Sequence, residues 1–409
     1  MNPIFKRAAQ AAIALAGLAV ASAATSAPLN VPEGNRVIAD QYIVVLKPEA
    51  ARTPVRNIAL GLVGNVGGGE LLQVYDRALK GFAVRLPEIA ARALANHRSV
   101  AYIEQDQFLE LVDTQTNAIY NLDRADQRTL PLSGTYSYPS NAGVGAHVYI
   151  IDTGLRSTHV DFAGRIGAGR NFAPNSSGSL LCSLLGVGCP TPDPTNTSDC
   201  NGHGTHVGGT ALGTSYGIAK KSLIHPVRVF GCANSTSTST IIAGVDWVTA
   251  NRILPAVANM SLGGGASTAL DTAVTNLINS GVTVVVAAGN ENADACGSSP
   301  ARVPAAITVG ATTRTDARAS YSNFGTCLDV FAPGDQVVSA SFQSDTGTST
   351  LSGTSMAAPL VAGIVARYLG VTPGATPAQN ASTLISTATP NLVTNPGAGS
   401  PNRLAYIAP

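Results

Sequence analysis

A repeated alternation of short apolar runs with helix-like stretches limits this chain more than any other feature of its sequence. The apolar runs occupy residues 147–151, 256–259, 282–288 and 305–309. Strands without polar alternation are buried on both faces, as in a parallel sheet covered by helices. Residues 239–251 and 269–280 have helical patterning, and Gly281 suits a helix C-cap. The alternation predicts an α/β domain with a doubly wound, mostly parallel sheet, and functional residues beyond the carboxyl ends of its strands.

Residues from about 40 to 111 form a separate and smaller segment. Strand-like runs occupy residues 42–46, 81–86 and 100–104, and residues 88–96 have a helical pattern. This order predicts a small α+β domain that contains a β-α-β unit.

The charge balance excludes several classes of partner. The 409 residues carry 25 Lys and Arg against 24 Asp and Glu, and no basic stripe is present. Nothing therefore predicts binding of nucleic acid or of an anionic membrane surface. The later apolar runs also stop short of the ~20 residues that a spanning helix needs. We expect a soluble mature protein with no membrane partner.

The first residues have the layout of a secretory signal peptide, which we place at residues 1–23. Lys6 and Arg7 precede an apolar stretch, and Ala21-Ser22-Ala23 supplies small residues for cleavage. Export permits disulfides, and an even number of cysteines allows all of them to pair. The six are Cys182, Cys189, Cys200, Cys232, Cys296 and Cys327. Their spacing alone does not choose among the possible pairings.

Three short segments place a reactive side chain where a strand or helix is expected to end or begin. Asp152 ends an apolar run, His203 lies between glycines before a helix-like run, and Ser355 precedes an apolar helix. Singly, such residues are commonly turn or helix caps. Together they supply a hydroxyl nucleophile, a base to take its proton and a carboxylate to orient the base. Asn290 ends another strand, and its amide and the backbone N–H of Ser355 are candidate oxyanion donors.

These segments resemble the signature motifs of subtilisin-like serine peptidases, most closely those of the proteinase K and aqualysin branch. The motifs are Asp152-Thr153-Gly154, His203-Gly204-Thr205-His206-Val207, Ala287-Ala288-Gly289-Asn290 and Gly353-Thr354-Ser355-Met356-Ala357. The chain order Asp, His, Ser is that of the family. The resemblance covers residues 113–409, while residues 41–111 resemble the family's inhibitory propeptide.

The resemblance implies a domain organisation. A propeptide at residues 24–112 would follow the signal peptide, with its inhibitor and chaperone domain at about 40–111. The peptidase domain would occupy residues 113–409, and maturation would cut the chain near Val112 or Asp113.

The resemblance also assigns roles to residues. Ser355 would be the nucleophile, His203 the general base and then acid, Asp152 its orienting partner and Asn290 an oxyanion donor. The residues implied in substrate binding are Asn234, Ser235, Thr236, Ser261, Leu262, Gly263, Ala287, Ala288 and Gly289. Main-chain pairing with the substrate implies broad specificity with a mostly apolar preference. The implied protein is a secreted, monomeric endopeptidase that cleaves proteins and peptides and is inhibited by its own propeptide.

Structural calcium and two disulfides are implied in the same way, and no cofactor is implied for catalysis. Calcium takes oxygen ligands. One site would combine Asp329 with the carbonyls of Pro304 and Ala306, and a second would combine Asp123, Asp126, Gln127 and Ser133. The implied bridges join Cys200 to Cys232 and Cys296 to Cys327, and pairing Cys182 with Cys189 is the simplest remaining choice.

The chain departs from the family pattern in two places. Ala358-Pro359-Leu360 stands where the family has Thr-Pro-His, in a helix interior that does no proton chemistry. Asn234 and Thr236 stand where glycines are common, so subsite preferences do not transfer from relatives. Glu291 follows Asn290, and at the pocket rim it would favour a basic side chain.

Three alternative functions remain to be weighed. An esterase would have its serine in a Gly-x-Ser-x-Gly elbow and the order Ser, Asp, His, neither of which is present. A zinc enzyme using Cys200, His203 and His206 would lack a Glu between the histidines and an evident fourth ligand. An inactive homologue that acts as a secreted binding module would differ from an enzyme in casein hydrolysis and its loss in Ser355→Ala.

Overall fold

The computed structural model describes residues 27–32, 37–107, 112–173 and 192–409. The chain divides into two compact units, an N-terminal unit (Met1–Leu109) and a C-terminal unit (Glu110–Pro409). The expected signal peptide and the expected Cys182–Cys189 pair lie outside the described residues.

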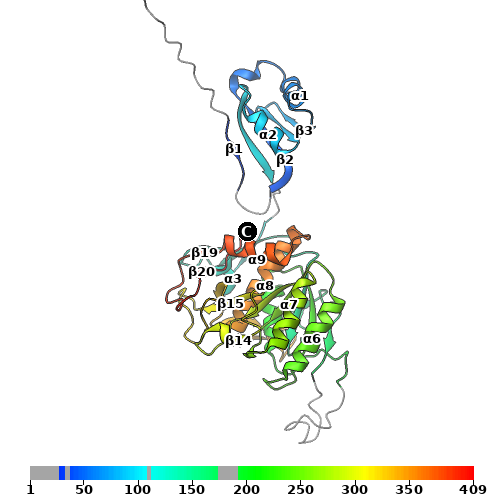
Figure 1. The fold of residues 1–409 in the computed structure, drawn as a ribbon, viewed down its shortest axis with the longest axis vertical. Helices are drawn as coiled ribbons and strands as arrows, with labels where there is room; N and C mark the ends of the chain where they lie inside the picture. Colours follow the sequence, from blue (N-terminus) through cyan, green and yellow to red (C-terminus); the bar gives the residue numbers. More distant parts are fainter. Residues whose placement is uncertain (1–26, 33–36, 108–111, 174–191) are drawn as a thin grey trace, which may run out of the picture. The chain divides into compact units, whose positions relative to one another are not determined.

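The N-terminal unit is a five-stranded sheet with two α-helices (Figure 1). Its strands are β1 (Leu29–Asn30), β2 (Val37–Leu46), β3 (Glu70–Tyr75), β4 (Gly81–Arg85) and β5 (Val100–Gln107), in the order β1-β5-β2-β4-β3. The helices are η1 (Pro48–Arg52), α1 (Val55–Asn65) and α2 (Glu88–Ala95). β2 pairs antiparallel with both β4 and β5, so β4-α2-β5 is the expected β-α-β unit with β2 inserted between its strands.

Sequence reasoning missed α1 and β3. The helix contains two glycines, and its N-cap residue, Pro54, offers no side-chain cap. Its apolar stripe is clear only once the helix is known: Val55, Ala59, Leu62 and Val63 are buried at helical spacing. These residues pack in a cluster whose buried members are all apolar.

The C-terminal unit contains a nine-stranded sheet in the order β19-β20-β16-β15-β13-β11-β8-β10-β9. Its strands are β8 (His147–Asp152), β9 (Arg170–Asn171), β10 (Leu223–Arg228), β11 (Ala256–Met260), β13 (Thr283–Ala287), β15 (Ile307–Thr312), β16 (Val330–Pro333), β19 (Thr389–Pro390) and β20 (Arg403–Leu404). All neighbours pair in parallel except β19 with β20. The expected α/β fold with a mostly parallel sheet is confirmed, including the four strands expected from the apolar runs. His225 and Pro226 interrupt the apolar run of β10, which explains why that strand escaped notice.

Helices cover both faces of this sheet. They are α5 (His203–Leu212), α6 (Thr238–Asn251), α7 (Thr268–Asn279), α8 (Thr354–Val371) and α9 (Pro377–Thr387). Val148 and Ile150 of β8 pack in the same cluster as α5 and α8, whereas Tyr149 and Ile151 pack with α6 and α7. Both faces of β8 are therefore buried, as its unbroken apolar sequence predicts.

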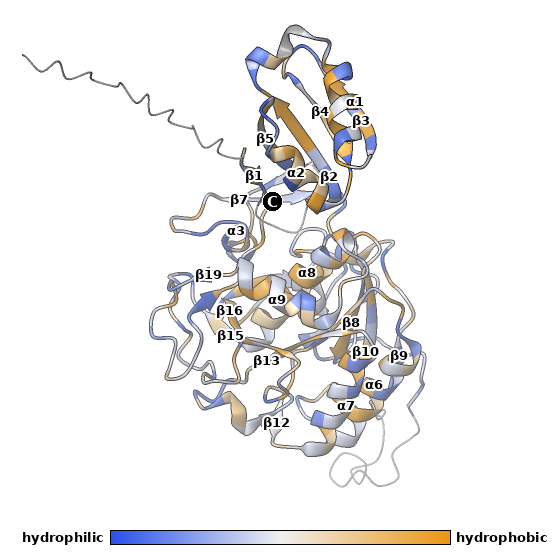
Figure 2. Cartoon of the chain, turned by 45° about the horizontal axis from the view of Figure 1, so that its top comes forward, coloured by the Kyte–Doolittle hydropathy of each residue, from blue (hydrophilic) through white to orange (hydrophobic). Residues whose placement is uncertain are grey.

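α8 is the most apolar helix of the unit. Among the described residues it alone is long and apolar enough to cross a membrane, with 18 residues and a mean hydropathy of 1.3, but 78% of it is buried within the protein. Figure 2 shows hydrophobic colour along α8, whereas α6 and α7 mix hydrophobic and hydrophilic residues. α8 is thus a core helix, and its first turn is held firmly by its surroundings.

The strand order places a crevice at one end of the sheet. After β8 the chain forms β9 and β10 on one side of it and then crosses to β11 on the other side, and ligands of doubly wound sheets bind where the order reverses in this way. Smaller elements surround the sheet: α3 (Tyr120–Ala125), η2 (Val160–Phe162), η3 (Ala295–Gly297), and the strand pairs β6 (Val112–Thr116) with β7 (Thr135–Pro139), β12 (Gly264–Gly265) with β14 (Ser298–Ser299), and β17 (Val337–Ala340) with β18 (Thr348–Leu351).

Candidate active site

The structure brings Asp152 and His203 together at the reversal point. Asp152 is the last residue of β8, and His203 is the first residue of α5. His203 Nδ1 lies 2.8 Å from Asp152 Oδ1, while the Asp152 side chain is 1% exposed and the His203 side chain 29% exposed. Burial lowers the pKa of His203, but the charge and hydrogen bond of Asp152 outweigh it, and the net pKa is raised. The imidazole is therefore oriented by a buried carboxylate that stabilises its protonated form.

Ser355 is the second residue of α8, in the first turn of the core helix. Its hydroxyl donates to the carbonyl oxygen of Ser261 (3.3 Å), and Ser261 Oγ donates back to the carbonyl oxygen of Ser355 (2.8 Å). The hydroxyl thus bonds to Ser261 rather than to His203. Hydrogen bonds between catalytic groups often form only in the complex with substrate.

Asn290 is held in one orientation by the residue before the serine. Asn290 Oδ1 accepts from Thr354 N (2.8 Å) and Thr354 Oγ1 (3.0 Å), and Gly289 N donates to Thr354 Oγ1 (3.1 Å). Because Oδ1 is engaged, the Nδ2 amino group is left to act as a donor. A Cβ atom on Gly353 would lie 3.6 Å from both Asn290 Nδ2 and Ser355 N. The two expected oxyanion donors therefore converge on the space beside Gly353.

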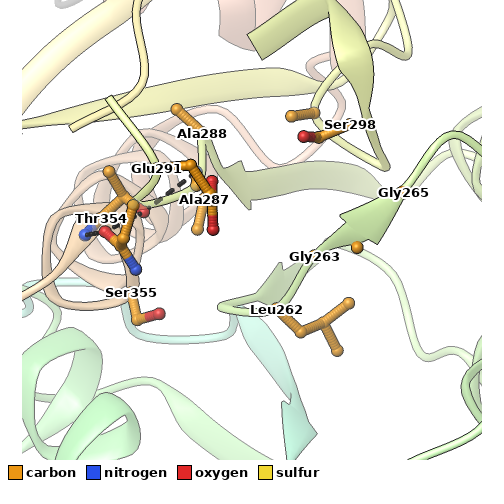
Figure 3. Close-up of a pocket in the computed structure, with 13 residues that line it drawn as sticks. Leu262, Gly263, Gly265, Ala287, Ala288, Glu291, Ser298, Thr354 and Ser355 are labelled. Atoms are coloured by element: carbon orange, nitrogen blue, oxygen red, sulfur yellow. Dashed lines mark hydrogen bonds between the residues drawn. The ribbon is translucent and has the colours of Figure 1, made fainter. Parts of the chain in front are cut away.

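A pocket of about 280 Å³ opens beside Ser355 (Figure 3). Its lining residues are Leu262, Gly263, Gly264, Gly265, Ala287, Ala288, Gly289, Asn290, Glu291, Ser298, Ala301, Thr354 and Ser355. Most of these are glycines and small apolar residues, and the one charged group is Glu291. Glu291 Oε2 accepts from Asn323 Nδ2 (2.8 Å), so the carboxylate is anchored at the pocket.

Two backbone segments at the site are free to pair with an added strand. Within the described residues, no backbone hydrogen bond to another main-chain group is formed by residues 234–236 or 261–263. The unusual side chains of the first segment bond to the protein itself: Asn201 Nδ2 donates to Asn234 Oδ1 (2.7 Å), and Thr236 Oγ1 donates to the Val229 carbonyl (2.7 Å). The segment is therefore anchored by two of its own side chains.

Disulfides join Cys200 to Cys232 and Cys296 to Cys327, the two pairs implied by the resemblance. The first bridge removes Cys200 from the zinc alternative, since its sulfur is not free to ligate a metal. His206 Nε2 lies 3.0 Å from the Val337 carbonyl, and burial lowers the pKa of His206 to about 4. Within the described residues, no three His, Cys, Asp or Glu side chains are grouped as metal ligands. These contacts exclude the proposed Cys200, His203 and His206 site.

The candidate calcium ligands differ in how well they fit a cation. Asp329 Oδ2 accepts from Thr308 N (2.8 Å), and burial raises the pKa of Asp329 to about 6. Asp126 Oδ1 is buried without a hydrogen-bond partner, and burial raises the pKa of Asp126 to about 6 as well. A hard cation stabilises the charged form of a buried carboxylate whose pKa is raised, so both aspartates suit calcium as ligands.

The other members of the second set are already bonded to one another. Ser133 Oγ donates to Asp123 Oδ1 (2.9 Å), and Ser133 N donates to both Asp123 Oδ1 (3.1 Å) and Gln127 Oε1 (3.2 Å). The structure brings these three residues together, while Asp126 Oδ2 accepts from Ser137 N (2.7 Å). Carboxylate and amide oxygens can accept further partners, so these bonds are compatible with a cation.

Two residues of the site were not anticipated from the sequence. Thr354 fixes Asn290, and Asn323 fixes Glu291. Thr354 has a local signal, because it adjoins the reactive serine. Asn323 has none, because it lies 32 residues from Glu291 and only the fold brings the two together.

In this site a buried carboxylate orients a histidine, a serine lies in the first turn of a helix, and two amide donors converge. These features define the class of serine hydrolases with an Asp-His-Ser triad. Comparison with known proteins narrows the class. Residues 143–404 match the subtilase family, and residues 41–112 match the family of peptidase inhibitors I9. The chain belongs to the subtilase family.

Known serine proteinases align with this chain over most of its length. It is 50% identical over 419 aligned residues to the extracellular serine proteinase of Thermus sp. (strain Rt41A), covering 96% of this chain and 97% of that protein. It is 46% identical to alkaline serine exoprotease A of Vibrio alginolyticus, covering 90% of this chain and 67% of the relative. A crystal structure of a cold-adapted subtilisin-like serine proteinase superposes with a TM-score of 0.65 at 49% identity, covering 72% of this chain and 100% of that chain.

These findings identify a secreted, subtilisin-like serine endopeptidase that is made as a precursor with an inhibitor-type propeptide and processes itself. The expectation of an enzyme is confirmed, and a binding module is not favoured.

Proposed function

We propose that Asp152, His203, Ser355 and Asn290 carry the peptidase reaction. The observation that supports this most strongly is the 2.8 Å contact between His203 and the buried Asp152. The first turn of the helix that carries Ser355 also fixes Asn290. In the reaction, His203 takes the proton of Ser355 as the serine oxygen attacks the scissile carbonyl. Asp152 stabilises the imidazolium that forms and keeps its charge throughout.

The developing oxyanion is stabilised by Asn290 Nδ2 and the backbone N–H of Ser355. Both donors are in place before substrate binds, because Thr354 holds the amide and the helix holds the N–H. Preorganised donors of this kind act without reorganisation during the reaction. Collapse of the tetrahedral intermediate gives an acyl-enzyme on Ser355, with His203 returning the proton to the leaving amine. Water then attacks the acyl-enzyme with His203 again as general base, and the second product is released from Ser355.

Substrate recognition follows from the two unpaired backbone segments and the pocket. A substrate in extended conformation would pair with residues 234–236 and 261–263, which gives affinity with little sequence demand. Apolar side chains suit the Gly- and Ala-rich pocket between Leu262 and Ala288 (Figure 3). The anchored Glu291 adds acceptance of a lysine or arginine at the same position.

The N-terminal unit would act as the intramolecular inhibitor of the same chain. Its residues 41–112 match an inhibitor family, and the expected cut near Val112 or Asp113 falls at the start of β6. The proposed organisation is a signal peptide at 1–23, a propeptide at 24–112 and a peptidase domain at 113–409, acting as a monomer. Calcium would be structural, held by Asp329 with the carbonyls of Pro304 and Ala306, and by the set around Asp123 and Asp126.

The test of this function is hydrolysis of casein by the secreted protein and by Ser355→Ala. We expect the wild type to accumulate as a mature chain starting near residue 113 and to hydrolyse casein. Ser355→Ala should remain an uncut precursor without activity. A cut, casein-hydrolysing Ser355→Ala protein would contradict the proposal.

A further inference from the structure

A second carboxylate, that of Asp199, lies between the end of β8 and the start of α5. Its Oδ1 accepts from Thr153 Oγ1 (2.9 Å), Asn201 N (2.9 Å) and Gly202 N (2.8 Å). Its Oδ2 accepts from Thr205 N (2.9 Å) and Thr205 Oγ1 (2.6 Å). A carboxylate offers about four lone-pair sites, so Asp199 is fully engaged by the residues around it.

These bonds connect the two elements that carry the Asp-His pair. Thr153 follows Asp152 at the end of β8, and Gly204 follows His203 at the start of α5. Gly204 N donates to Thr153 Oγ1 (2.8 Å), and the same hydroxyl donates to Asp199. The strand end and the helix start are therefore joined through one hydroxyl that Asp199 holds in place.

Asp199 also acts on His203 through its charge. Asp199 accepts from Gly202, the N-cap residue of α5, and from Thr205 in the first turn of this ten-residue helix. A negative charge at this end of a helix is favourable. The charge of Asp199 helps Asp152 to raise the pKa of His203 against the effect of burial.

Two further titratable groups, His206 and Arg228, interact with His203 and Asp199. Burial lowers the pKa of His206 to about 4, so this histidine is neutral at neutral pH. Arg228, at the end of β10, interacts with the charge of Asp199 and donates from Nη2 to Cys200 Sγ (3.1 Å). His203 therefore faces two carboxylates, Asp152 in direct contact and Asp199 through the loop.

We infer that Asp199 is a positioning residue of this enzyme. Its carboxylate holds the end of β8 and the start of α5 at the spacing that the His203–Asp152 bond requires, and its charge favours the imidazolium formed when Ser355 loses its proton. The inference rests on the proposed triad. A purely structural cap would stabilise α5 without affecting the protonation of His203, so the pH dependence of the reaction separates the two roles.

The experiment compares mature enzymes obtained from full-length precursors, with active sites counted by a fluorophosphonate. The variants are Asp199→Asn, Thr205→Val and Thr205→Ser, with Asp193→Asn as control. Asp193 is exposed and bonds Thr195 rather than the α5 start. For each enzyme, kcat and KM are measured for a short peptide substrate between pH 4 and pH 10.

Asp199→Asn should lower kcat about tenfold with little change in KM. The acid limb of its kcat/KM profile should move to lower pH by about half a pH unit, because loss of the charge lowers the pKa of His203. Thr205→Val keeps the charge but loses a bonded hydroxyl, so kcat should fall with the acid limb unmoved, and Thr205→Ser should restore kcat. Asp193→Asn should match the wild type.

Wild-type kcat and an unmoved acid limb in Asp199→Asn would overturn the inference, even if its melting temperature falls. If Asp199→Asn yields too little mature enzyme, Thr205→Val decides, since an unchanged kcat there would also overturn it. Failure of the triad itself would look different: the wild type would not react with the fluorophosphonate, or Ser355→Ala would keep its activity.

Discussion

The two units of the chain differ most in what they bury. In the described part of the N-terminal unit, the buried side chains are apolar, from Val44 and Phe82 to Ile103. In the C-terminal unit, many polar groups are buried as well, Asp152 and His206 among them. Burying a polar group is costly unless it is bonded. The difference separates a unit with an apolar interior from one that also buries bonded polar groups, those of the candidate site among them.

One ion pair from each unit shows the same contrast. Arg85–Glu70 in the N-terminal unit lies at the surface, with side chains 53% and 63% exposed, and such pairs add little to stability. Arg124–Asp316 in the C-terminal unit is 3% and 9% exposed, and its guanidinium forms two bonds to the carboxylate. Because the candidate site lies in the C-terminal unit, changes in the N-terminal unit should alter the yield of mature enzyme, whereas changes at the site should alter its rate of catalysis.

The largest effect is expected for Asn290→Ala. Loss of one oxyanion donor should lower kcat on the order of 10²- to 10³-fold, with little change in KM or melting temperature. Steady-state kinetics on titrated mature enzyme measure this. Asn276→Ala, at an exposed position of α7, is the control and should behave as wild type. A wild-type kcat in Asn290→Ala would place the oxyanion donors elsewhere.

Phe82→Ala tests the expectation that the N-terminal unit affects the yield of enzyme and not its rate. Phe82 is fully buried in β4, and its truncation should cost about 3–5 kcal/mol, enough to unfold a small unit. The yield of titrated mature enzyme should fall about tenfold or more, while kcat per active site stays unchanged. Ile89→Ala, at a site 80% exposed on α2, should leave both values unchanged. A changed kcat in Phe82→Ala would break the division of roles.

Calcium removal should lower stability before it affects the chemistry. Asp329 has a pKa raised to about 6 by burial, so its ionisation opposes folding and, without calcium, stability falls as the pH rises through about 6. Calcium binding should offset this, raising the melting temperature by about 5 °C at pH 7.5 and by less at pH 5. Thermal unfolding in calcium and in EDTA measures the difference. Equal melting temperatures in calcium and in EDTA would contradict both calcium sites, and a calcium effect of full wild-type size in Asp329→Asn would remove Asp329 from its site.

Glu291→Gln is expected to give the smallest effect. The carboxylate lines the pocket and is held by Asn323, so its loss should lower kcat/KM for substrates with lysine before the scissile bond about 3- to 5-fold relative to leucine. The effect should weaken in high salt. Asp246→Asn, exposed on α6, should leave the lysine-to-leucine ratio unchanged. The same ratio in Glu291→Gln would mean that the carboxylate does not act on the substrate.

The fold class and the candidate site residues could be predicted from the sequence because both depend on short segments of the chain. Unbroken apolar runs mark β8, β11 and β13, and Asp152, Asn290 and Ser355 each adjoin such a run or an apolar helix. Features that depend on distant contacts could not be predicted. Asn323 reaches Glu291 from another loop, and Asp199 bonds Thr153 across 46 residues.

The sequence analysis also missed strands whose local signals are weak. β10 contains His225 and Pro226 and reads as irregular, although it pairs along its full length with β8. Its strand character comes from its neighbours and not from its own sequence.

The central claim is that Ser355 is an activated nucleophile in a chain that has processed itself. The most direct measurement is mass spectrometry of the secreted protein after reaction with a serine-directed fluorophosphonate. We predict a single label on Ser355 of a chain that begins near residue 113, and no label on His203→Ala. A folded, cut chain that carries no label, or carries it on another serine, would contradict the account.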